Sequence, residues 1–405
     1  DKSDEGEGKY LGLKWDRKCD LFYMNFKLNL GGTIRGKRQE DDLSIEGVEL
    51  LHPLTKREVL RLTCQFYDSA GLGTPLIIGL RILYSQICQD TKLGMRDVLP
   101  SEMQVKIKTI VLELLKGKSL GFPRQIVFNG ETNIVIFFDG SLSAYGAVAY
   151  AHSVGKGGHL LTSTAKVIGR GKYSPPQSEM AAALLAVRLG NKIKHELSDI
   201  VINNVLFIGD SQIVLNMIAR GRPARMNVFF GCRVLAILAD SLASQWFWCG
   251  GPDNPADLTT RPGCSARELD TDFWRQGGFI STANQENWPI TPCLELNNTD
   301  GIEIKRTDIS DQPDHGCIRK LIKDTVSLVR TTNVLVLISS MVARFRARKS
   351  GTPPPALYDT ISKVKLSILL AFKAETDSLI ENKRVSKHLV TLRVNGVWMA
   401  ADRSF

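Results

Sequence analysis

The feature that most constrains the fold is an alternation of strand-like and helix-like patterns between residues 126 and 268. Residues 133–138 form a continuous apolar run, which is typical of a strand buried on both faces. Two runs of small and apolar residues follow at 144–151 and 159–168, as in an antiparallel meander. The spacing of apolar residues then predicts, in order, a helix at 177–197, a strand at 201–209, helices at 211–218 and 228–242 and a strand at 245–249. This order, with a final helix expected after it, predicts an α/β fold with a mixed sheet and flanking helices.

The whole chain is too long for one ordinary core, since it has 405 residues. Shifts in pattern divide it into four regions. These are a mixed region of short strands and helices at 1–125, the α/β region at 126–268, a linker rich in Asn, Thr, Asp and Pro at 269–315, and a segment that is helical by period at 316–405.

Basic residues exceed acidic ones, and the net charge is +10. Residues 317–405 hold 16 Lys or Arg and 6 Asp or Glu, so this stretch alone accounts for 16 − 6 = +10. Such an excess favours a polyanionic partner, although solvated helix faces explain it equally well.

The eight cysteines form no CxxC pair, which indicates reduced thiols in an intracellular protein and not a disulfide framework. The N-terminal residues lack the pattern of a signal peptide, so we expect a fragment of a longer chain that is not secreted. The apolar runs are too short for a membrane span, and no membrane partner is expected.

Four carboxylates stand at positions where an α/β sheet would bring them together. Asp139 and Asp210 each follow an apolar strand pattern, and strand ends meet at the edge where ligands bind. Glu179 lies in the first turn of the helix expected to cross the sheet, and Asp257 follows Pro255 at a helix start. Each acid alone is explained as well by a turn or by the helix dipole.

Phosphodiester hydrolysis is the chemistry that such a grouping suits. Two divalent ions can activate a water and stabilise the leaving oxygen. Mg²⁺ prefers oxygen ligands and keeps several waters, so a few carboxylates from separate elements can hold two ions, with Mn²⁺ as a possible substitute. The four acids therefore predict a two-metal site.

Four segments resemble, in order, the ribonuclease H blocks of Pao/BEL-type LTR retrotransposon polyproteins: FFDGSLSAYGAVAY, SPPQSEMAAALLAVRLGNKI, FIGDSQIVLNMI and GPDNPADLTTRPG. The resemblance implies that residues 1–125 are the end of a reverse-transcriptase palm with its connection, and that 126–268 are a ribonuclease H-like domain. It also implies that residues 316–405 precede an integrase. The polymerase core and the integrase would lie in the remaining polyprotein segments, so neither activity is expected from this chain.

The resemblance also implies roles for the four acids. Asp139 would bridge both ions, Asp257 would join it on the ion that activates water, and Glu179 and Asp210 would hold the second ion. Glu179 would read the 2′-hydroxyl that distinguishes RNA from DNA. The chain would thus be an endonuclease that cuts the RNA strand of an RNA–DNA hybrid.

Basic, aromatic and hydroxyl side chains near these acids are candidates for contact with the nucleic acid. For Tyr145, partial burial on a strand explains the residue at least as well as binding does. For the arginines of the loop at 220–225, contact with phosphate and a purely structural loop are equally plausible. The predicted set is Ser141, Tyr145, Ser211, Gln212, Arg222, Arg225, Arg233 and Arg261.

Two other functions remain open at this point. One is a catalytically silent nucleic-acid-binding or connection module of a decayed or domesticated element. The other is a transposase or integrase core, which the order of the acids disfavours because Glu179 precedes Asp210.

Overall fold

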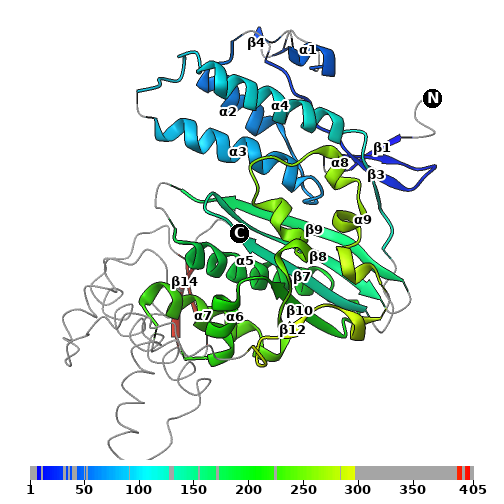
Figure 1. Ribbon diagram of the computed structural model, residues 1–405, viewed down its shortest axis with the longest axis vertical. Coiled ribbons are helices and arrows are strands. Elements are labelled where there is room, and N and C mark those ends of the chain that lie inside the picture. The colour runs from blue at the N-terminus through cyan, green and yellow to red at the C-terminus, as the bar shows by residue number, and fades with distance from the viewer. Residues whose placement is uncertain are drawn as a thin grey trace, which may run out of the picture. The chain divides into compact units, whose positions relative to one another are not determined.

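A computed structural model gives the arrangement of the chain (Figure 1). It describes residues 7–296, except positions 11, 31–32, 35–36, 39–42, 50, 52, 91, 127–131, 154–155, 170–172, 223–225 and 283, and it describes residues 390–394 and 397–401. The chain divides into two compact units, residues 1–221 with 237–300 and residues 222–236 with 301–405. Of the described helices, none is both long and apolar enough to cross a membrane.

A six-stranded mixed sheet dominates the first unit, with the strand order β12-β11-β10-β7-β8-β9 (Figure 1). Strands β7, β8 and β9 pair antiparallel, as the meander pattern predicts. Strand β10 runs parallel to β7, β11 runs parallel to β10, and β12 returns antiparallel. The predicted mixed α/β sheet is confirmed. The strands are β7 (Thr132–Gly140), β8 (Ala144–Ser153), β9 (Gly157–Val167), β10 (Asn204–Gly209), β11 (Trp246–Trp248) and β12 (Thr291–Pro292).

The two faces of β7 pack against different parts of the chain, because side chains alternate along a strand. Helix α5 (Pro175–Glu196) packs on one face, where its Gly190 approaches Ile136. On the other face, Val135 and Phe137 belong to a buried cluster shared with the N-terminal helices. Burial of β7 on both sides explains its continuous apolar sequence. Helices α6 (Gln212–Arg220) and α7 (Val228–Asp240) follow, close to the predicted bounds.

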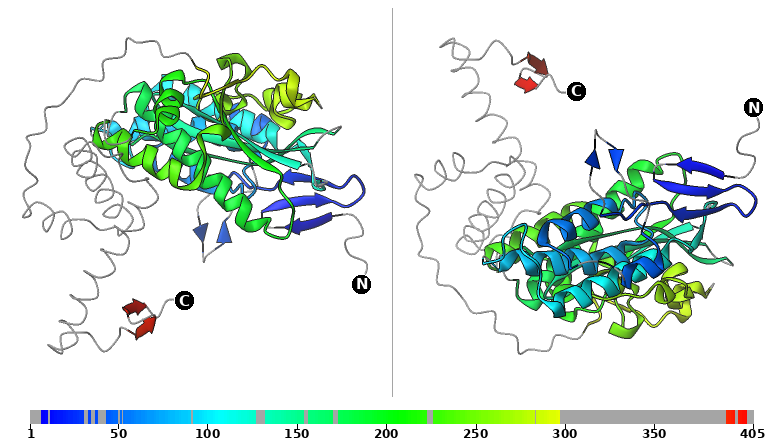
Figure 2. Two further views of the ribbon diagram at one scale, coloured as in Figure 1. Left: turned by 90° about the horizontal axis from the view of Figure 1, so that it is seen from below. Right: turned by 90° about the horizontal axis from the view of Figure 1, so that it is seen from above.

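In its described residues, the N-terminal part contributes helices α1 to α4 and two antiparallel sheets, β1-β2-β3-β6 and β4-β5 (Figure 2). Thr55 caps α2 through a capping box with Glu58. The chain turns at Gly12, between β1 and β2, where a φ of 84° favours glycine. The elements are β1 (Glu7–Tyr10), β2 (Leu13–Asp16), β3 (Leu21–Met24), β4 (Thr33–Ile34), β5 (Lys37–Arg38), α1 (Ile45–Glu49), α2 (Lys56–Gln65), α3 (Thr74–Gln89), α4 (Ser101–Gly117) and β6 (Gly121–Pro123).

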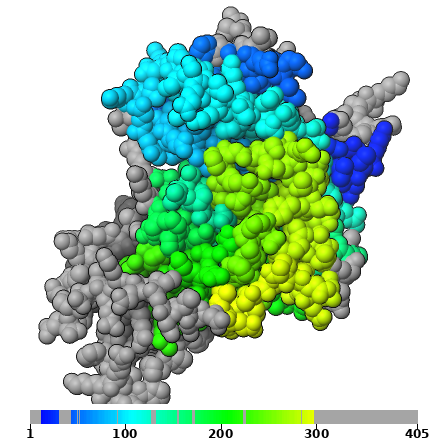
Figure 3. Space-filling model, viewed as in Figure 1, coloured from blue at the N-terminus to red at the C-terminus, as the bar shows by residue number. Residues whose placement is uncertain are grey.

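Residues 269–293 do not form the linker that their composition predicts. They form short helical turns and strand β12, and they bury Trp274, Ile280, Trp288 and Cys293. Figure 3 shows this segment, in yellow-green to yellow, beside the blue to cyan N-terminal helices. One-turn elements have no amphipathic period, so the pattern could not reveal them. In this segment they are α9 (Asp272–Arg275), η5 (Gly278–Ser281) and η6 (Gln285–Asn287). Other short elements precede it: η2 (Ala243–Gln245), η3 (Gly251–Asp253), η4 (Pro255–Thr259) and α8 (Ala266–Leu269).

Near the C-terminus, residues 390–394 and 397–401 of the second unit are described. Strands β13 (Val390–Val394) and β14 (Val397–Ala401) form an antiparallel hairpin. The prediction of helix at 316–405 is therefore wrong for these two stretches. The rest of that segment, and residues 297–315 of the expected linker, lie outside the described residues. The four domain boundaries stay predictions.

Candidate metal centre

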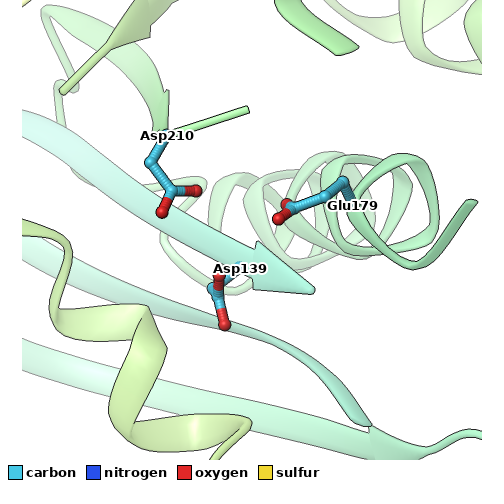
Figure 4. A group of neighbouring side chains, drawn as sticks. All are labelled: Asp139, Glu179 and Asp210. Carbon is cyan, nitrogen blue, oxygen red and sulfur yellow. The ribbon is translucent and has the colours of Figure 1, made fainter. Parts of the chain in front are cut away.

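Three of the four predicted acids meet at one edge of the sheet (Figure 4). Asp139 lies near the end of β7, and Asp210 follows the end of β10, the parallel neighbour of β7. Glu179 reaches toward them from the first turns of α5. Asp139, Glu179 and Asp210 each offer one ligand oxygen, and these oxygens lie within 4.8 Å of one another.

Close packing of α5 on the end of β7 brings Glu179 to this edge. A Cβ on Gly140 would lie 2.4 Å from the backbone nitrogen of Glu179, so only glycine allows this approach. The hydroxyl of Ser178 donates to the carbonyl of Gly140 across the same contact (3.3 Å). Ser174 is the N-cap residue of α5, and its backbone nitrogen donates to the side chain of Gln177 (2.8 Å), which helps to fix where the helix begins.

The cluster concentrates negative charge in a buried place. Burial, together with the charges of Asp210 and Asp257, raises the pKa of Asp139 to about 6, although a hydrogen bond from Thr260 opposes this. Burial and the charges of Asp139 and Asp210 raise the pKa of Glu179 to about 9. Burial also raises the pKa of Asp210. Without a cation these groups resist ionising together.

A divalent cation fits what these residues offer. Oε2 of Glu179 and Oδ1 of Asp210 are buried and have no hydrogen-bond partner among the described residues. Buried polar atoms in folded proteins are nearly always satisfied, so both oxygens suit a metal ligand role. The set is made only of oxygen donors, which Mg²⁺ and Mn²⁺ accept.

Asp257 lies beside this group but outside it. It is in the first turn of η4, and its Oδ2 is 2.6 Å from Nε of Arg261. Its side chain is 43% exposed, in contrast to that of the buried Asp139. Its charge nevertheless contributes to the raised pKa of both Asp139 and Asp210. The structure thus brings three predicted acids together and holds the fourth at their border.

Two further residues of the site were not predicted from the sequence. The hydroxyl of Thr260 donates to Oδ2 of Asp139. Asn254 is fully buried, caps η4 and donates from Nδ2 to the carbonyl of Phe138 (3.0 Å). A hydrogen bond from Asn254 also lowers the pKa of Asp210 against the effect of burial. The only signal in the sequence was the capping pattern of Asn254 before Pro255.

The residues predicted to contact nucleic acid fall into two groups. Ser141, Tyr145, Ser211, Gln212 and Arg261 lie in the first unit, near the ends of β7, β10 and η4. The hydroxyl of Ser141 donates to the carbonyl of Thr260 (3.1 Å), which gives it a structural role. Ser211 is the N-cap residue of α6 but makes no capping hydrogen bond with its side chain.

The predicted arginines at 222 and 233 belong to the second unit. Arg222 is exposed. The guanidinium of Arg233 lies 3.5 Å from the centre of the Phe229 ring and donates to the Phe229 carbonyl (2.9 Å). Arg225 lies outside the described residues.

Comparison with solved structures gives low overall similarity. Ribonuclease H1 from the halophilic archaeon Halobacterium salinarum NRC-1 is 16% identical, with a TM-score of 0.23, over 34% of this chain and 98% of that one. The foamy viral protease-reverse transcriptase in complex with RNA/DNA hybrid is 11% identical, with a TM-score of 0.35, over 64% of this chain and 31% of that one. The same viral protein with double-stranded DNA gives 11% identity and a TM-score of 0.30, over 51% and 37% of the two chains.

A family model matches part of the chain, whereas no curated protein matches it. Residues 55–211 match the family model of the Pao retrotransposon-like RNaseH-like domain. This range includes Asp139, Glu179 and Asp210 and begins at the cap of α2, before the boundary that the sequence pattern predicts, whereas Asp257 lies beyond its end. The resemblance is therefore confirmed as a match to the Pao retrotransposon-like RNaseH-like family over residues 55–211.

Proposed function

We propose that this chain is a metal-dependent endonuclease that hydrolyses the RNA strand of RNA–DNA hybrids. The observation that supports it most directly is the group of three carboxylates, one buried and two half-buried, whose ligand oxygens lie within 4.8 Å of one another and two of which have unsatisfied oxygens. The group lies in a segment that matches an RNaseH-like family. A silent structural domain would have no need of such costly buried acids.

Asp139, Glu179 and Asp210 would hold Mg²⁺ or Mn²⁺, and Asp257 would complete the set for a second ion. When bound, the metal supplies an activated water and stabilises the leaving oxygen. Thr260 orients the carboxylate of Asp139 by its hydrogen bond. Asn254 fixes the turn that carries Asp257 by its bond to the strand that carries Asp139. Glu179, which lies in the first turns of α5, would contact a 2′-hydroxyl of the RNA strand.

The test is cleavage of an end-labelled RNA strand, in a hybrid and in RNA and DNA duplexes, by the purified full chain. We expect cleavage of the hybrid with Mg²⁺ or Mn²⁺ and none with a chelator. Asp139→Asn should reduce turnover by at least about 10³-fold, because it removes a charged ligand of the metal. Asp199→Asn, at an exposed site after α5, is the matched control and should cleave normally.

A second function, a catalytically silent nucleic-acid-binding module, is favoured by one observation. Arg261 forms an ion pair with the carboxylate of Asp257, so the fourth proposed metal ligand already has a partner. If the folded chain binds metal and hybrid but never cleaves, this second function holds. Binding through phosphates should then weaken steeply as salt rises.

The context of the domain is also part of the proposal. We propose that the chain belongs to a polyprotein, with polymerase segments upstream and integrase segments downstream. It would act inside the cell, in a cytoplasmic particle or in the nucleus. Residues 1–125 would be the palm end with its connection, and residues 316–405 would be the basic segment before the integrase. Residues 1–54 and 316–405 lie outside the family match.

A further inference from the structure

Asp257, the fourth predicted acid, forms an ion pair with Arg261 beside the three clustered carboxylates. Nε of Arg261 is 2.6 Å from Oδ2 of Asp257, four residues earlier. Within the described part of the chain, no Lys, Arg or His forms an ion pair with Asp139, Glu179 or Asp210. Of the four predicted acids, Arg261 therefore forms an ion pair only with Asp257, the one that lies outside the cluster.

This contact is easy to exchange. The two side chains are each 43% exposed, so water can replace either partner. The Nε–H of Arg261 meets no acceptor in hydrogen-bond geometry among the described residues, despite the short distance. The contact is thus an ion pair held by charge, without the directional bond that would fix it.

A second carboxylate, that of Glu268, also lies close to the guanidinium of Arg261. Oε1 of Glu268 is 3.7 Å from Nη1 of Arg261. The other oxygen of Glu268 accepts from the backbone nitrogen of Ser265 (2.7 Å) and from its hydroxyl (2.9 Å). Glu268 is therefore held in place by the capping box of α8, with one oxygen facing the guanidinium.

The backbone around Arg261 is fixed, so only its side chain can change partner. The carbonyl of Pro262 lies so close to α3 that a Cβ on Gly79 would be 2.2 Å from it. The carbonyl of Thr260 accepts from Ser141 (3.1 Å). The nitrogen of Ala266 donates to Glu113 on α4 (2.8 Å). These contacts fix both ends of the loop.

We infer that Arg261 is a positioning residue that controls entry of Asp257 into the metal centre by exchanging Asp257 for Glu268 as its carboxylate partner. This inference rests on the proposed metal site. In the absence of metal, Arg261 shields Asp257 from the other acids. A second cation at the centre competes for Asp257, and Glu268 receives the guanidinium that is released. Binding of the second ion is thus weakened by Arg261 and assisted by Glu268.

The test is a titration of the full chain with Mn²⁺, without nucleic acid, followed by electron paramagnetic resonance to count bound ions and measure their affinities. Arg261→Gln should bind the weaker ion about 2–5-fold more tightly, the scale expected for loss of one exposed ion pair. Glu268→Gln, which keeps a capping side chain, should bind it about 2-fold more weakly. Arg261→Lys should restore affinity toward that of the unmodified chain, because it keeps the charge.

Two comparisons separate this exchange from a merely structural role. In the double variant, Glu268→Gln should have no effect once Arg261→Gln is present, since Glu268 acts only through the guanidinium. Arg267→Gln removes an exposed charge from the same helix and should leave Mn²⁺ affinity unchanged. Equal effects of Glu268→Gln in both backgrounds, or no gain of affinity in Arg261→Gln, would overturn the inference.

The same titration separates failure of the inference from failure of the proposed function. If the unmodified chain binds Mn²⁺ and Asp139→Asn does not, the metal centre stands whatever Arg261 does. If the folded, unmodified chain binds no Mn²⁺, both the centre and the exchange are wrong.

Discussion

At the scale of single residues, the site is a balance between burial and charge. The acids that an open sheet edge gathers are more buried than isolated carboxylates tolerate, and their pKa values rise as a result. A cation bound at the proposed site would relieve this cost, so metal binding and folding should be coupled.

The stability of the metal-free chain should fall as pH rises. Burial and the charges of Asp139 and Asp210 raise the pKa of Glu179 in the folded state to about 9, from an ordinary value of 4.5. A raised pKa contributes stability that is present below pH 4.5 and is lost as pH rises through about 9. Urea unfolding in a chelator should therefore show a decline that Glu179→Gln reduces by ~1 kcal/mol or more at pH 9. Equal slopes in both proteins would contradict the burial of an uncompensated Glu179, and Mg²⁺ should remove the difference by restoring the unmodified chain.

The hydroxyl of Thr260 should matter for metal binding. It donates to Asp139, and this bond stabilises the ionised carboxylate that a metal requires. Thr260→Val keeps the shape and removes the donor, so we expect about 5–10-fold weaker Mn²⁺ binding, given ~1–1.5 kcal/mol for such a bond. Thr109→Val, on the exposed side of α4, removes a comparable hydroxyl and should bind Mn²⁺ normally. Calorimetric titration measures both, and unchanged affinity in Thr260→Val would show that Asp139 needs no orienting donor.

At the scale of elements, the parts predicted well from the sequence were those with a period. Strand β7, the meander and helix α5 have patterns long enough to identify, and the positions of Asp139, Asp210 and Glu179 follow from them. The position of Asp257 outside the cluster could not be predicted, because η4 is too short to show a period. The ion pair of Asp257 with Arg261 depends on the path of the loop between them. The roles of Thr260 and Asn254 depend on contacts with β7 over more than a hundred residues, which no local pattern contains.

The junction of α5 with β7 should tolerate no side chain at Gly140. A methyl group there would lie 2.4 Å from the backbone of Glu179 and would push the start of α5 away from the sheet. Gly140→Ala should destabilise the chain by ~1–3 kcal/mol and weaken Mn²⁺ binding, because Glu179 moves with the helix. Gly169→Ala, where nothing lies within 4 Å, is the matched control. Thermal unfolding and Mn²⁺ titration test both effects; a stable Gly140→Ala with normal binding would mean that α5 is not held this tightly.

At the scale of the whole molecule, the folded core extends beyond residues 126–268, the region where strand and helix patterns alternate. The segment after residue 268 closes the core on the face of the sheet that α5 leaves uncovered. Trp274 is fully buried, its indole donates to the carbonyl of Leu72 (3.1 Å), and its own carbonyl accepts from Tyr150 (2.9 Å). One residue thus joins the N-terminal helices to the central sheet.

A chain shortened to end at residue 268, where the sequence pattern predicts the boundary, should therefore not fold. It would lose Trp274, Ile280 and Trp288 and would expose the apolar face of β8. Loss of a buried aromatic alone costs ~3–5 kcal/mol, which is comparable to the whole stability of many domains. A chain that ends at residue 296 keeps the segment and should melt cooperatively with native near-ultraviolet circular dichroism. Trp274→Ala in the full chain distinguishes the two explanations for a failure at 268: a lowered but cooperative transition would assign the loss to packing. If instead the shorter chain melts like the longer one, the segment only covers a core that is already complete, and the boundary predicted from the sequence is the right one.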